Sequence, residues 1–437
     1  MIVSQAFKGK TYAVLGLARS GLATVDTLVA SGARVVAWDS REEARAAVAD
    51  KAELGDPMEI DLAGFDGIVV SPGVPLNKHP IAMRAKIAGV PIIGDIELFA
   101  LARPTLPPHK VVGITGTNGK STTTALIHHI IEQAGLPARM GGNIGLPILG
   151  QEPLEPNLHG VGVYVLELSS YQIDLTHSLD CDVAVLLNIT PDHLDRYNGF
   201  VGYVASKARL FAMQSAEHVA VIATEDEPSR GIAASAPAQL REVKAADIDP
   251  EAQLGWPSLQ GPHNAQNAAV AIAVGRALGI DDATIMAALA SYASLPHRMQ
   301  AVGTHNGVLY VNDSKATNAA STAPALGAWP ARDGKPRIHW ILGGVAKSDN
   351  LDECAPYYGN IAHAYTIGEA GHMFADLLRP HMAVDDSEML SAAVRRAARI
   401  AQPGDVVLLS PACASFDQFR DFEARGDAFA AAVNALE

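Results

Sequence analysis

Short apolar runs alternate with amphipathic segments along most of the chain. The runs are rich in Val and Ile and end in Gly, Pro, Ser or Asp, which is typical of buried strands. The segments between them carry apolar residues at helical spacing. This alternation predicts an α/β fold with mainly parallel sheets.

The predicted strands fall into three blocks. Residues 1–95 contain TYAVLG, RVVAW, DGIVVS and VPII. Residues 96–296 include the proline-rich link ARPTLPPHK and contain KVVGITG, VYVLELSS, VAVLLNIT and VAVIAT. Residues 297–437 begin near LPHRMQ and contain VLYVND, RIHWILGG, AYTIG and DVVLLSP. A length of 437 residues predicts two or three domains, and the three blocks favour three domains with these boundaries.

Charge and cysteine content narrow the classes of function. The chain has 33 Lys and Arg against 47 Asp and Glu, a net charge of −14, and such a surface repels nucleic acid and anionic membranes. No apolar run reaches the length of a membrane span, and the N-terminus lacks a signal-peptide pattern. Cys181, Cys354 and Cys413 form no CxxC pair, which argues against a disulfide framework or zinc-finger spacing. We expect a cytoplasmic protein that binds neither nucleic acid nor membrane.

The stretch VVGITGTNGKSTTTALIHH, residues 111–129, predicts a strand, a glycine-rich loop and a helix. The general phosphate-loop pattern GxxxxGK[ST] has four residues between its glycines, whereas five separate Gly113 from Gly119. Read as TGTNGKST, the loop has a shorter glycine spacing and the same chemistry. Its backbone N–H groups approach phosphate oxygens, Lys120 neutralises phosphate charge, and the Ser121 hydroxyl is placed to bind Mg²⁺. The loop therefore predicts a nucleoside triphosphate site.

Two later strands end in candidate metal ligands. Glu167 lies near the end of VYVLELSS, where a carboxylate is costly unless it meets a metal or a hydrogen-bonding partner. The strand in LLNITPDHLDRY opens into a loop with Asp192, His193 and Asp195. Carboxyl ends of parallel strands share one edge, so these groups are expected beside the phosphate loop. The alternative is that Asp192 caps a helix and His193 is a surface turn residue.

The first block has a second candidate nucleotide site. The stretch VLGLARSGLA follows a strand, opens a helix and leads to Asp39, as in a dinucleotide-binding fingerprint. Ala18 occupies the position of the middle glycine, and Arg19 and Ser20 bring polar groups to the turn. We therefore expect a different nucleotide diphosphate here. The segment Ser71–Pro75, SPGVP, ends a neighbouring strand and is placed to close over this site, or else is a plain turn.

Nine motifs occur in an order that resembles the Mur ligases, and they span essentially the whole chain. They are GITGTNGKSTT, LELSSYQ, LNITPDHLDRY, SKARLF, GPHNAQN, LPHRMQ, NDSKATN, GGVAKS and SPACASFDQF. Within the family, the likeness is greatest to members that add D-glutamate. The resemblance implies an ATP-dependent ligase of peptidoglycan precursor synthesis that joins D-glutamate to UDP-N-acetylmuramoyl-L-alanine through an acyl phosphate.

The resemblance also implies the nature of each domain. Residues 1–95 are expected to form a Rossmann-like domain that binds the UDP-sugar, and residues 96–296 a P-loop ATPase domain with a mainly parallel sheet. Residues 297–437 are expected to form a second Rossmann-like domain, which binds the amino acid. The implied ligands are ATP, two Mg²⁺ ions, D-glutamate and the UDP-sugar, and the chain is expected to act as a monomer.

Roles for individual residues follow from the same resemblance. The implied catalytic residues are Lys120, Glu167, His193 and Lys207. The implied metal ligands are Ser121, Glu167, His193 and a carbamylated Lys207. The implied ATP contacts are Gly116, Thr117, Asn118, Gly119, Lys120, Ser121, Thr122, Asn264, Asn267, Arg298, Asp313 and Lys315. The implied UDP-sugar contacts are Arg19, Ser20, Asp39, Ser40, Gly73 and Asn143. The implied D-glutamate contacts are Thr317, Lys347, Ser415, Phe416 and Phe422.

Several of these residues have simpler alternatives. Lys207 is otherwise an exposed helix lysine, Lys347 a solvated loop lysine and Phe422 a core residue. We expect a helix after SPACAS, with Phe422 about two turns along it from Ser415 and on the same face. Phe416 stands where a leucine is common in the family, and this leaves the fit around the amino acid open.

Three other functions compete with this hypothesis. A folylpolyglutamate synthase resembles the second and third blocks, but such enzymes usually begin at the ATP domain. A non-catalytic switch would bind ATP only to open and close its domains. A dehydrogenase based on the first loop would bind NAD, but it would leave the phosphate loop of residues 111–129 unexplained.

Overall fold

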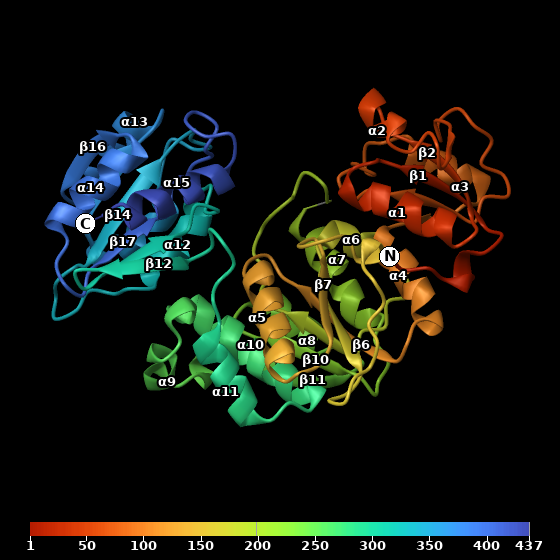
Figure 1. Ribbon diagram of the computed structural model, residues 1–437, viewed down its shortest axis with the longest axis horizontal. Coiled ribbons are helices and arrows are strands. Elements are labelled where there is room, and N and C mark those ends of the chain that lie inside the picture. Colours follow the sequence, from red (N-terminus) through yellow and green to blue (C-terminus); the bar gives the residue numbers. More distant parts are fainter. Residues whose placement is uncertain (198, 437) are drawn as a thin grey trace. The chain divides into compact units, whose positions relative to one another are not determined.

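The computed structural model describes residues 1–197 and 199–436 (Figure 1). It contains three sheets flanked by helices, and all but one of the strand pairings are parallel, so the predicted α/β class is confirmed. The described residues divide into two compact units. The first unit comprises Met1–Asp247 and Ala269–Ala288, and the second comprises Ile248–Ala268 and Leu289–Glu437.

The first sheet has the strand order β3-β2-β1-β4-β5. Its strands are β1 (Thr11–Leu15), β2 (Arg34–Trp38), β3 (Glu53–Leu54), β4 (Gly67–Val70) and β5 (Ile92–Ile93). The helices in this part are η1 (Gln5–Phe7), α1 (Arg19–Ala30), α2 (Glu42–Ala46), α3 (Ile81–Ala88), α4 (Asp95–Ala102) and η2 (Arg103–Thr105). The order reverses between β1 and β4, and the loops after these two strands therefore flank the crevice where open α/β sheets bind ligands.

The second sheet has the order β11-β10-β9-β6-β8-β7 and is parallel throughout. Its strands are β6 (His109–Thr115), β7 (Ala138–Gly142), β8 (Gly162–Glu167), β9 (Val183–Leu186), β10 (Val219–Ala223) and β11 (Gln239–Val243). Its helices are α5 (Lys120–Gln133), η3 (Ile148–Gly150), α6 (Ser170–Asp174), α7 (Phe200–Ala212), α8 (Glu227–Ala233) and η4 (Ala245–Asp247). Because β6 lies between β8 and β9, the loops that follow these three strands are neighbours at one edge.

The third sheet lies in the second unit and has the order β12-β13-β17-β14-β15-β16. Its strands are β12 (Gln300–His305), β13 (Val308–Asn312), β14 (Ile338–Gly343), β15 (Ile361–Ile367), β16 (Val384–Glu388) and β17 (Val406–Leu409). The helices are α9 (Pro250–Leu254), η5 (Pro257–Leu259), α12 (Ala319–Gly327), η6 (Asp352–Asn360), α13 (Gly371–Leu378), α14 (Leu390–Ile400) and α15 (Phe422–Asn434). Two helices, α10 (Pro262–Leu278) and α11 (Asp282–Ser291), run from one unit into the other.

Apolar burial explains why the predicted strands form. The strands β8, β9, β14 and β17 are buried at every position, as expected for parallel strands covered on both faces. One continuous core in the first unit joins residues of the first sheet, such as Val14, to residues of the second, such as Leu166. The loops after the strands, rather than this core, carry the candidate site residues.

The strands that the apolar pattern did not indicate are short, polar or at an edge. They are β3, β7, β11, β12 and β16, and β12 pairs with β13 antiparallel. Their exposed faces remove the apolar run on which the prediction rested. Within residues 1–197 and 199–436, no helix has both the length and the apolar character needed to cross a bilayer.

Candidate active site

The glycine-rich loop joins β6 to α5 in a conformation that needs glycine. Gly116 has φ 155° and Gly119, which immediately precedes α5, has φ 83°. A Cβ atom on Gly116 would lie 2.9 Å from the Cβ of Leu187. Side chains are therefore excluded, and the backbone is left open to close approach by a ligand. Lys120, the first residue of α5, donates from Nζ to the carbonyls of Gly116 at 2.9 Å and Thr117 at 2.8 Å.

The loop is fixed from outside by the residues that follow β9. Asn188 accepts from the backbone of Asn118 with its side-chain oxygen at 2.8 Å and from Thr117 N with its carbonyl at 2.8 Å. The hydroxyl of Thr117 accepts from Thr190 N at 3.0 Å. These contacts fix the shape of the loop, and such pre-organisation lowers the entropy cost of binding phosphate.

Glu167, the last residue of β8, lies at the same edge and is 2% exposed. Its Oε1 accepts from Asn143 Nδ2 at 2.9 Å, but its buried Oε2 has no hydrogen-bond partner. A buried carboxylate oxygen without a donor is costly, and a cation would satisfy it. Among the described residues, no three His, Cys, Asp or Glu side chains gather in a metal-binding arrangement. A metal here would therefore also need hydroxyl, phosphate or water oxygens, and the buried Ser121 at the start of α5 is the hydroxyl candidate of the glycine-rich loop.

Lys207 on α7 is not the exposed helix lysine of the simpler alternative, because it is 1% exposed. Its Nζ donates to the Gly116 carbonyl at 2.9 Å and to Thr115 Oγ1 at 3.3 Å, and lies 4.7 Å from the centre of the Tyr203 ring. Burial, together with the charge of Lys120, lowers the pKa of Lys207 to about 7. The side chain thus reaches the glycine-rich loop with its neutral amine accessible near neutral pH.

His193 lies in the loop after β9 and has a left-handed backbone, φ 52°. Its Nε2 is 3.6 Å from Asp192 Oδ2, and its ring centre is 5.1 Å from that of Tyr171. Asp192 accepts from the His193 backbone at 2.8 Å, whereas the residue before α7 is Gly199, so the helix-cap alternative for Asp192 is wrong. The imidazole is half-exposed and is therefore open to a ligand that enters from solvent.

The first sheet places its candidates around the reversal between β1 and β4. The Ser71 hydroxyl donates to the Gly16 carbonyl at 3.1 Å, which joins the loops after the two strands. Asp39 accepts from Leu17 N at 2.7 Å and therefore shapes the loop after β1. Arg19 donates to the Gly145 carbonyl at 3.0 Å, close in sequence to Asn143, which follows β7 of the second sheet. Gly73 has open space where a Cβ would be.

In the second unit, the candidate nucleotide contacts lie in two groups. Asn264 and Asn267 are buried on α10, and Asn267 Nδ2 donates to Asn264 Oδ1 at 3.1 Å. Asp313 follows β13 and accepts from Ser410 Oγ at 2.7 Å and Met299 N at 3.2 Å. Burial raises the pKa of Asp313 to about 7. Arg298, one residue before Met299, contributes a nearby positive charge.

The expected helix after SPACAS is absent between Ser415 and Phe422. The Ser415 carbonyl accepts from Gln418 N and Phe419 N in a turn, and α15 begins only at Phe422. Our prediction of the helix start was wrong because Asp421 caps α15 by accepting from the backbone of the third helical residue at 2.7 Å.

The aromatic side chains of this segment also lie differently from the expectation. Phe422 packs under Lys315, whose Nζ is 3.8 Å from the ring centre. This contact associates Phe422 with a candidate nucleotide contact. Phe416 is 73% exposed. The expectation that Phe422 shares a helix face with Ser415 is therefore wrong, because Ser415 lies outside α15.

Two other candidate D-glutamate contacts are brought together. The loop after β13 carries Thr317 and the loop after β14 carries Lys347. Lys347 Nζ donates to Thr317 Oγ1 at 3.2 Å, and the lysine is exposed. An exposed ammonium with only a neutral hydroxyl partner in this contact retains capacity to bind an incoming carboxylate.

Arg425 is a residue that motif reading missed. It is 1% exposed on α15, and its Nη2 donates to the carbonyls of Ser314 at 2.9 Å and Cys413 at 3.0 Å. Its Nη1 reaches the Gly343 carbonyl at 3.4 Å, and burial lowers its pKa to about 10. One side chain thus holds the loops that follow β13 and β17 to the last residue of β14. Helical spacing could have indicated that Arg425 is buried, because it lies four residues before buried Phe429 and therefore on the same face of α15.

Comparison with known families accounts for this arrangement. Residues 10–94 match the Mur ligase MurD-like N-terminal domain, residues 114–256 the Mur ligase middle domain, and residues 297–413 the Mur ligase glutamate ligase domain. Among solved structures, the MurF ligase from Thermotoga maritima in complex with ADP aligns with a TM-score of 0.60 at 16% identity, covering 99% of this chain and 97% of that one. At such identity the likeness concerns the fold.

Curated relatives are much closer in sequence. The UDP-N-acetylmuramoylalanine–D-glutamate ligase of Novosphingobium aromaticivorans is 66% identical, over 100% of this chain and 97% of that protein. The ligase of the same name from Sphingopyxis alaskensis is 64% identical over 100% of both chains. With identity of this level over its full length, a glycine-rich loop and a buried lysine at one sheet edge, the chain belongs to the Mur ligase family.

Proposed function

We propose that this chain is an ATP-dependent ligase that joins D-glutamate to UDP-N-acetylmuramoyl-L-alanine in peptidoglycan precursor synthesis. The observation that carries the proposal is the placement of Lys207, which is buried and bonded to the Gly116 carbonyl of the glycine-rich loop. A buried lysine at that loop with its pKa lowered to about 7 suits such a reaction, because its neutral amine can be carbamylated and then hold a metal ion beside the triphosphate. The names of the relatives at 66% and 64% identity support the same substrates.

Each of the three ligands is assigned to the part of the chain that contains one of the three sheets. We propose that residues 1–95 form a Rossmann-like domain for the UDP-sugar, residues 96–296 a P-loop domain for ATP, and residues 297–437 a Rossmann-like domain for the amino acid. The strand-order reversal in the first sheet supports the first assignment. The conformation of Gly116 and Gly119 ahead of α5 supports the second.

Chemistry proceeds in two balanced steps in this proposal. The muramoyl-alanine carboxylate attacks the γ-phosphorus, and the bond to the β-phosphate oxygen breaks to release ADP. The amine of D-glutamate then attacks the acyl carbon, loses a proton and expels phosphate. Both reactants of the first step are anions, so Lys120 lowers their repulsion and the glycine-rich loop fixes the line of attack.

The residues at this edge fit a divalent cation. The unpartnered Oε2 of Glu167 would bind Mg²⁺ together with Ser121, and His193 and a carbamylated Lys207 would hold a second ion. When bound, Mg²⁺ supplies charge neutralisation at the phosphate oxygens. The pKa of Lys207, about 7, supports carbamylation because only the neutral amine adds CO₂.

Selection of the amino acid is assigned to the second unit. We propose that Lys347 and Thr317 receive a carboxylate of D-glutamate. Ser415, in the loop after β17, is proposed as a further contact of the amino acid. The 3.2 Å contact between Lys347 and Thr317 supports a shared site. A carboxylate entering it exchanges water for a charge-assisted hydrogen bond.

The decisive experiment is phosphate release by the purified full-length chain. Release should require ATP, Mg²⁺, UDP-N-acetylmuramoyl-L-alanine and D-glutamate together, and L-glutamate should be a poor substitute. A folylpolyglutamate-type ligase would use a folate substrate instead of the UDP-sugar. A non-catalytic switch would bind ATP tightly without glutamate-dependent release. Full-rate release without any amino acid would refute the ligase assignment.

A further inference from the structure

Two loops from different sheets of the first unit meet beside the candidate active site. The loop after β4, residues 71–79, contains Gly73, the proposed UDP-sugar contact. The loop after β9, residues 187–197, contains His193, the proposed metal ligand. Asn77 Nδ2 of the first loop donates to the Asp195 carbonyl of the second at 3.2 Å. The two candidate sites are therefore physically joined through their loops.

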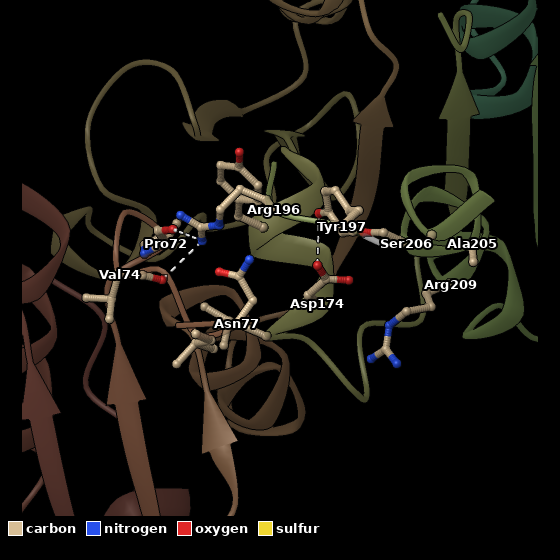
Figure 2. Close-up of a pocket in the computed structure, with 13 residues that line it drawn as sticks. Pro72, Val74, Asn77, Asp174, Arg196, Tyr197, Ala205, Ser206 and Arg209 are labelled. Carbon is tan, nitrogen blue, oxygen red and sulfur yellow. Dashed lines mark hydrogen bonds between the residues drawn. The ribbon is translucent and has the colours of Figure 1, made fainter. Parts of the chain in front are cut away.

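Arg196 makes the larger part of this junction. Its Nη2 donates to the Val74 carbonyl at 3.1 Å and to the Pro72 carbonyl at 3.4 Å (Figure 2). These two carbonyls lie on either side of Gly73, so one guanidinium group fixes the peptide path through that residue. The guanidinium carbon is also 4.2 Å from the centre of the Tyr171 ring, a cation–π contact.

The same arginine is coupled to His193. Its backbone N–H donates to the His193 carbonyl at 3.0 Å, which closes the turn around the left-handed histidine. The His193 ring also packs against Tyr171, with ring centres 5.1 Å apart. Tyr171 therefore contacts both the guanidinium and the imidazole. A movement of Arg196 away from the Gly73 loop would remove support from the histidine turn as well.

The neighbouring side chains leave room for such a movement. A cavity of about 470 Å³ lies beside Arg196, and its wall includes Asn77, Asp174, Tyr197 and Arg209. Tyr197 donates to Asp174 Oδ2 at 2.9 Å and so anchors the end of the histidine loop to α6 (Figure 2). The junction is thus held by a few directional contacts beside a cavity, and these contacts can be changed singly.

We propose that Arg196 is a positioning residue that makes binding of the UDP-sugar and placement of His193 one coupled event. It touches no reacting atom in this role. By holding the carbonyls on both sides of Gly73 to the turn of His193, it lets a ligand on the first loop stabilise the metal-binding form of the second. The inference rests on the proposed function for the identity of the substrate, whereas the junction itself can be tested without turnover.

The test compares Arg196→Ala and Arg196→Lys with Arg209→Ala in the full-length chain. Arg209 lines the same cavity but donates to the Thr176 carbonyl, away from the Gly73 loop, and is the matched control. In Arg196→Ala we expect the KM for UDP-N-acetylmuramoyl-L-alanine to rise about tenfold, as for loss of a charge-assisted contact. The Mg²⁺ concentration for half-maximal rate should rise with it, while the Kd of an unreactive ATP analogue stays unchanged. Arg196→Lys, which keeps one donor group, should recover part of the loss.

Hydrogen–deuterium exchange gives a readout that does not depend on the reaction. Exchange in residues 71–79 and 187–197 should become faster in Arg196→Ala and remain at the wild-type rate in Arg209→Ala. Addition of the UDP-sugar should slow exchange in both segments of the wild type and in only the first segment of Arg196→Ala. An unchanged exchange rate in Arg196→Ala, or equal rises in the KM for all substrates, would overturn the proposal. Faster exchange with unchanged KM and Mg²⁺ dependence would overturn it too. Failure of the wild type to release phosphate would count against the proposed function and leave the exchange test standing.

Discussion

Lys120 and Lys207 donate to the same backbone oxygen, the carbonyl of Gly116, each at 2.9 Å. One lysine comes from the start of α5 and the other from α7, so the fold converges two cations on a single neutral acceptor. Their mutual repulsion is one cause of the lowered pKa of Lys207, after burial. The first two predictions concern this pair of lysines.

Lys120→Ala should reduce turnover by orders of magnitude, because it removes a cation from the developing phosphoryl charge. Steady-state phosphate release checks this. Lys110→Ala, near the opposite end of β6, is the matched control and should keep a near-normal rate. A near-normal rate in Lys120→Ala itself would show that the glycine-rich loop is not the phosphate site.

Activity should depend on pH through Lys207. Its pKa of about 7 means that the neutral amine is lost as the pH falls below 7, and only that amine can add CO₂. We expect the initial rate to fall as the pH is lowered below 7 and added bicarbonate to restore part of the lost rate. Initial rates measured from about pH 6 to 9 check this. A rate that is insensitive to bicarbonate at every pH would contradict the carbamate.

Substitution of Lys207 tests directly whether a carbamate on this residue is needed for activity. Lys207→Ala should be inactive, and small carboxylic acids should partly restore its rate by standing in for the carbamate. Lys207→Arg keeps the positive charge but cannot be carbamylated, so it should be inactive too. Near-normal activity in either variant would remove Lys207 from the mechanism.

Glu167→Gln should separate function from stability. The amide cannot serve as an anionic metal ligand, so turnover should fall by orders of magnitude. Gln replaces a buried carboxylate by a neutral amide whose oxygen can still accept from Asn143, so the free energy of unfolding should not fall. Thermal unfolding and phosphate release measure the two effects, with exposed Glu217→Gln as the control. A large loss of stability would mean that the role of Glu167 is structural.

Lys347→Ala should raise the KM for D-glutamate strongly and change the KM for ATP little. Only the amino-acid carboxylate loses its cation in this variant, since Lys347 contacts Thr317 rather than the glycine-rich loop. Kinetics with each substrate varied in turn provide the measurement, and the exposed Lys335→Ala is the control. Equal rises for both substrates would refute the assignment of Lys347 to D-glutamate.

The buried strands and the glycine-rich loop could be predicted from the sequence, because both depend on local properties of the chain. The buried strands β6, β8, β9, β14 and β17 appear as apolar runs because both of their faces are covered. The loop before α5 is recognisable because Gly116 and Gly119 adopt backbone angles that other residues avoid. Since parallel strands end at one edge, the presence of Glu167 and His193 near that loop could be predicted as well.

Tertiary contacts decided what the pattern left open. Burial of Lys207, the hydrogen bond from Asn143 to Glu167 and the bridge from Arg196 to the Gly73 loop all join segments far apart in the chain. The helix expected directly after SPACAS begins only at Phe422, behind the cap at Asp421, and this cap is a local signal that apolar periodicity does not contain. The sequence by itself determined which strands are buried and which loop needs glycine, since backbone angles and apolar periodicity are local properties. The partner of each polar side chain was decided only by the tertiary structure, because hydrogen-bond geometry depends on how distant elements pack.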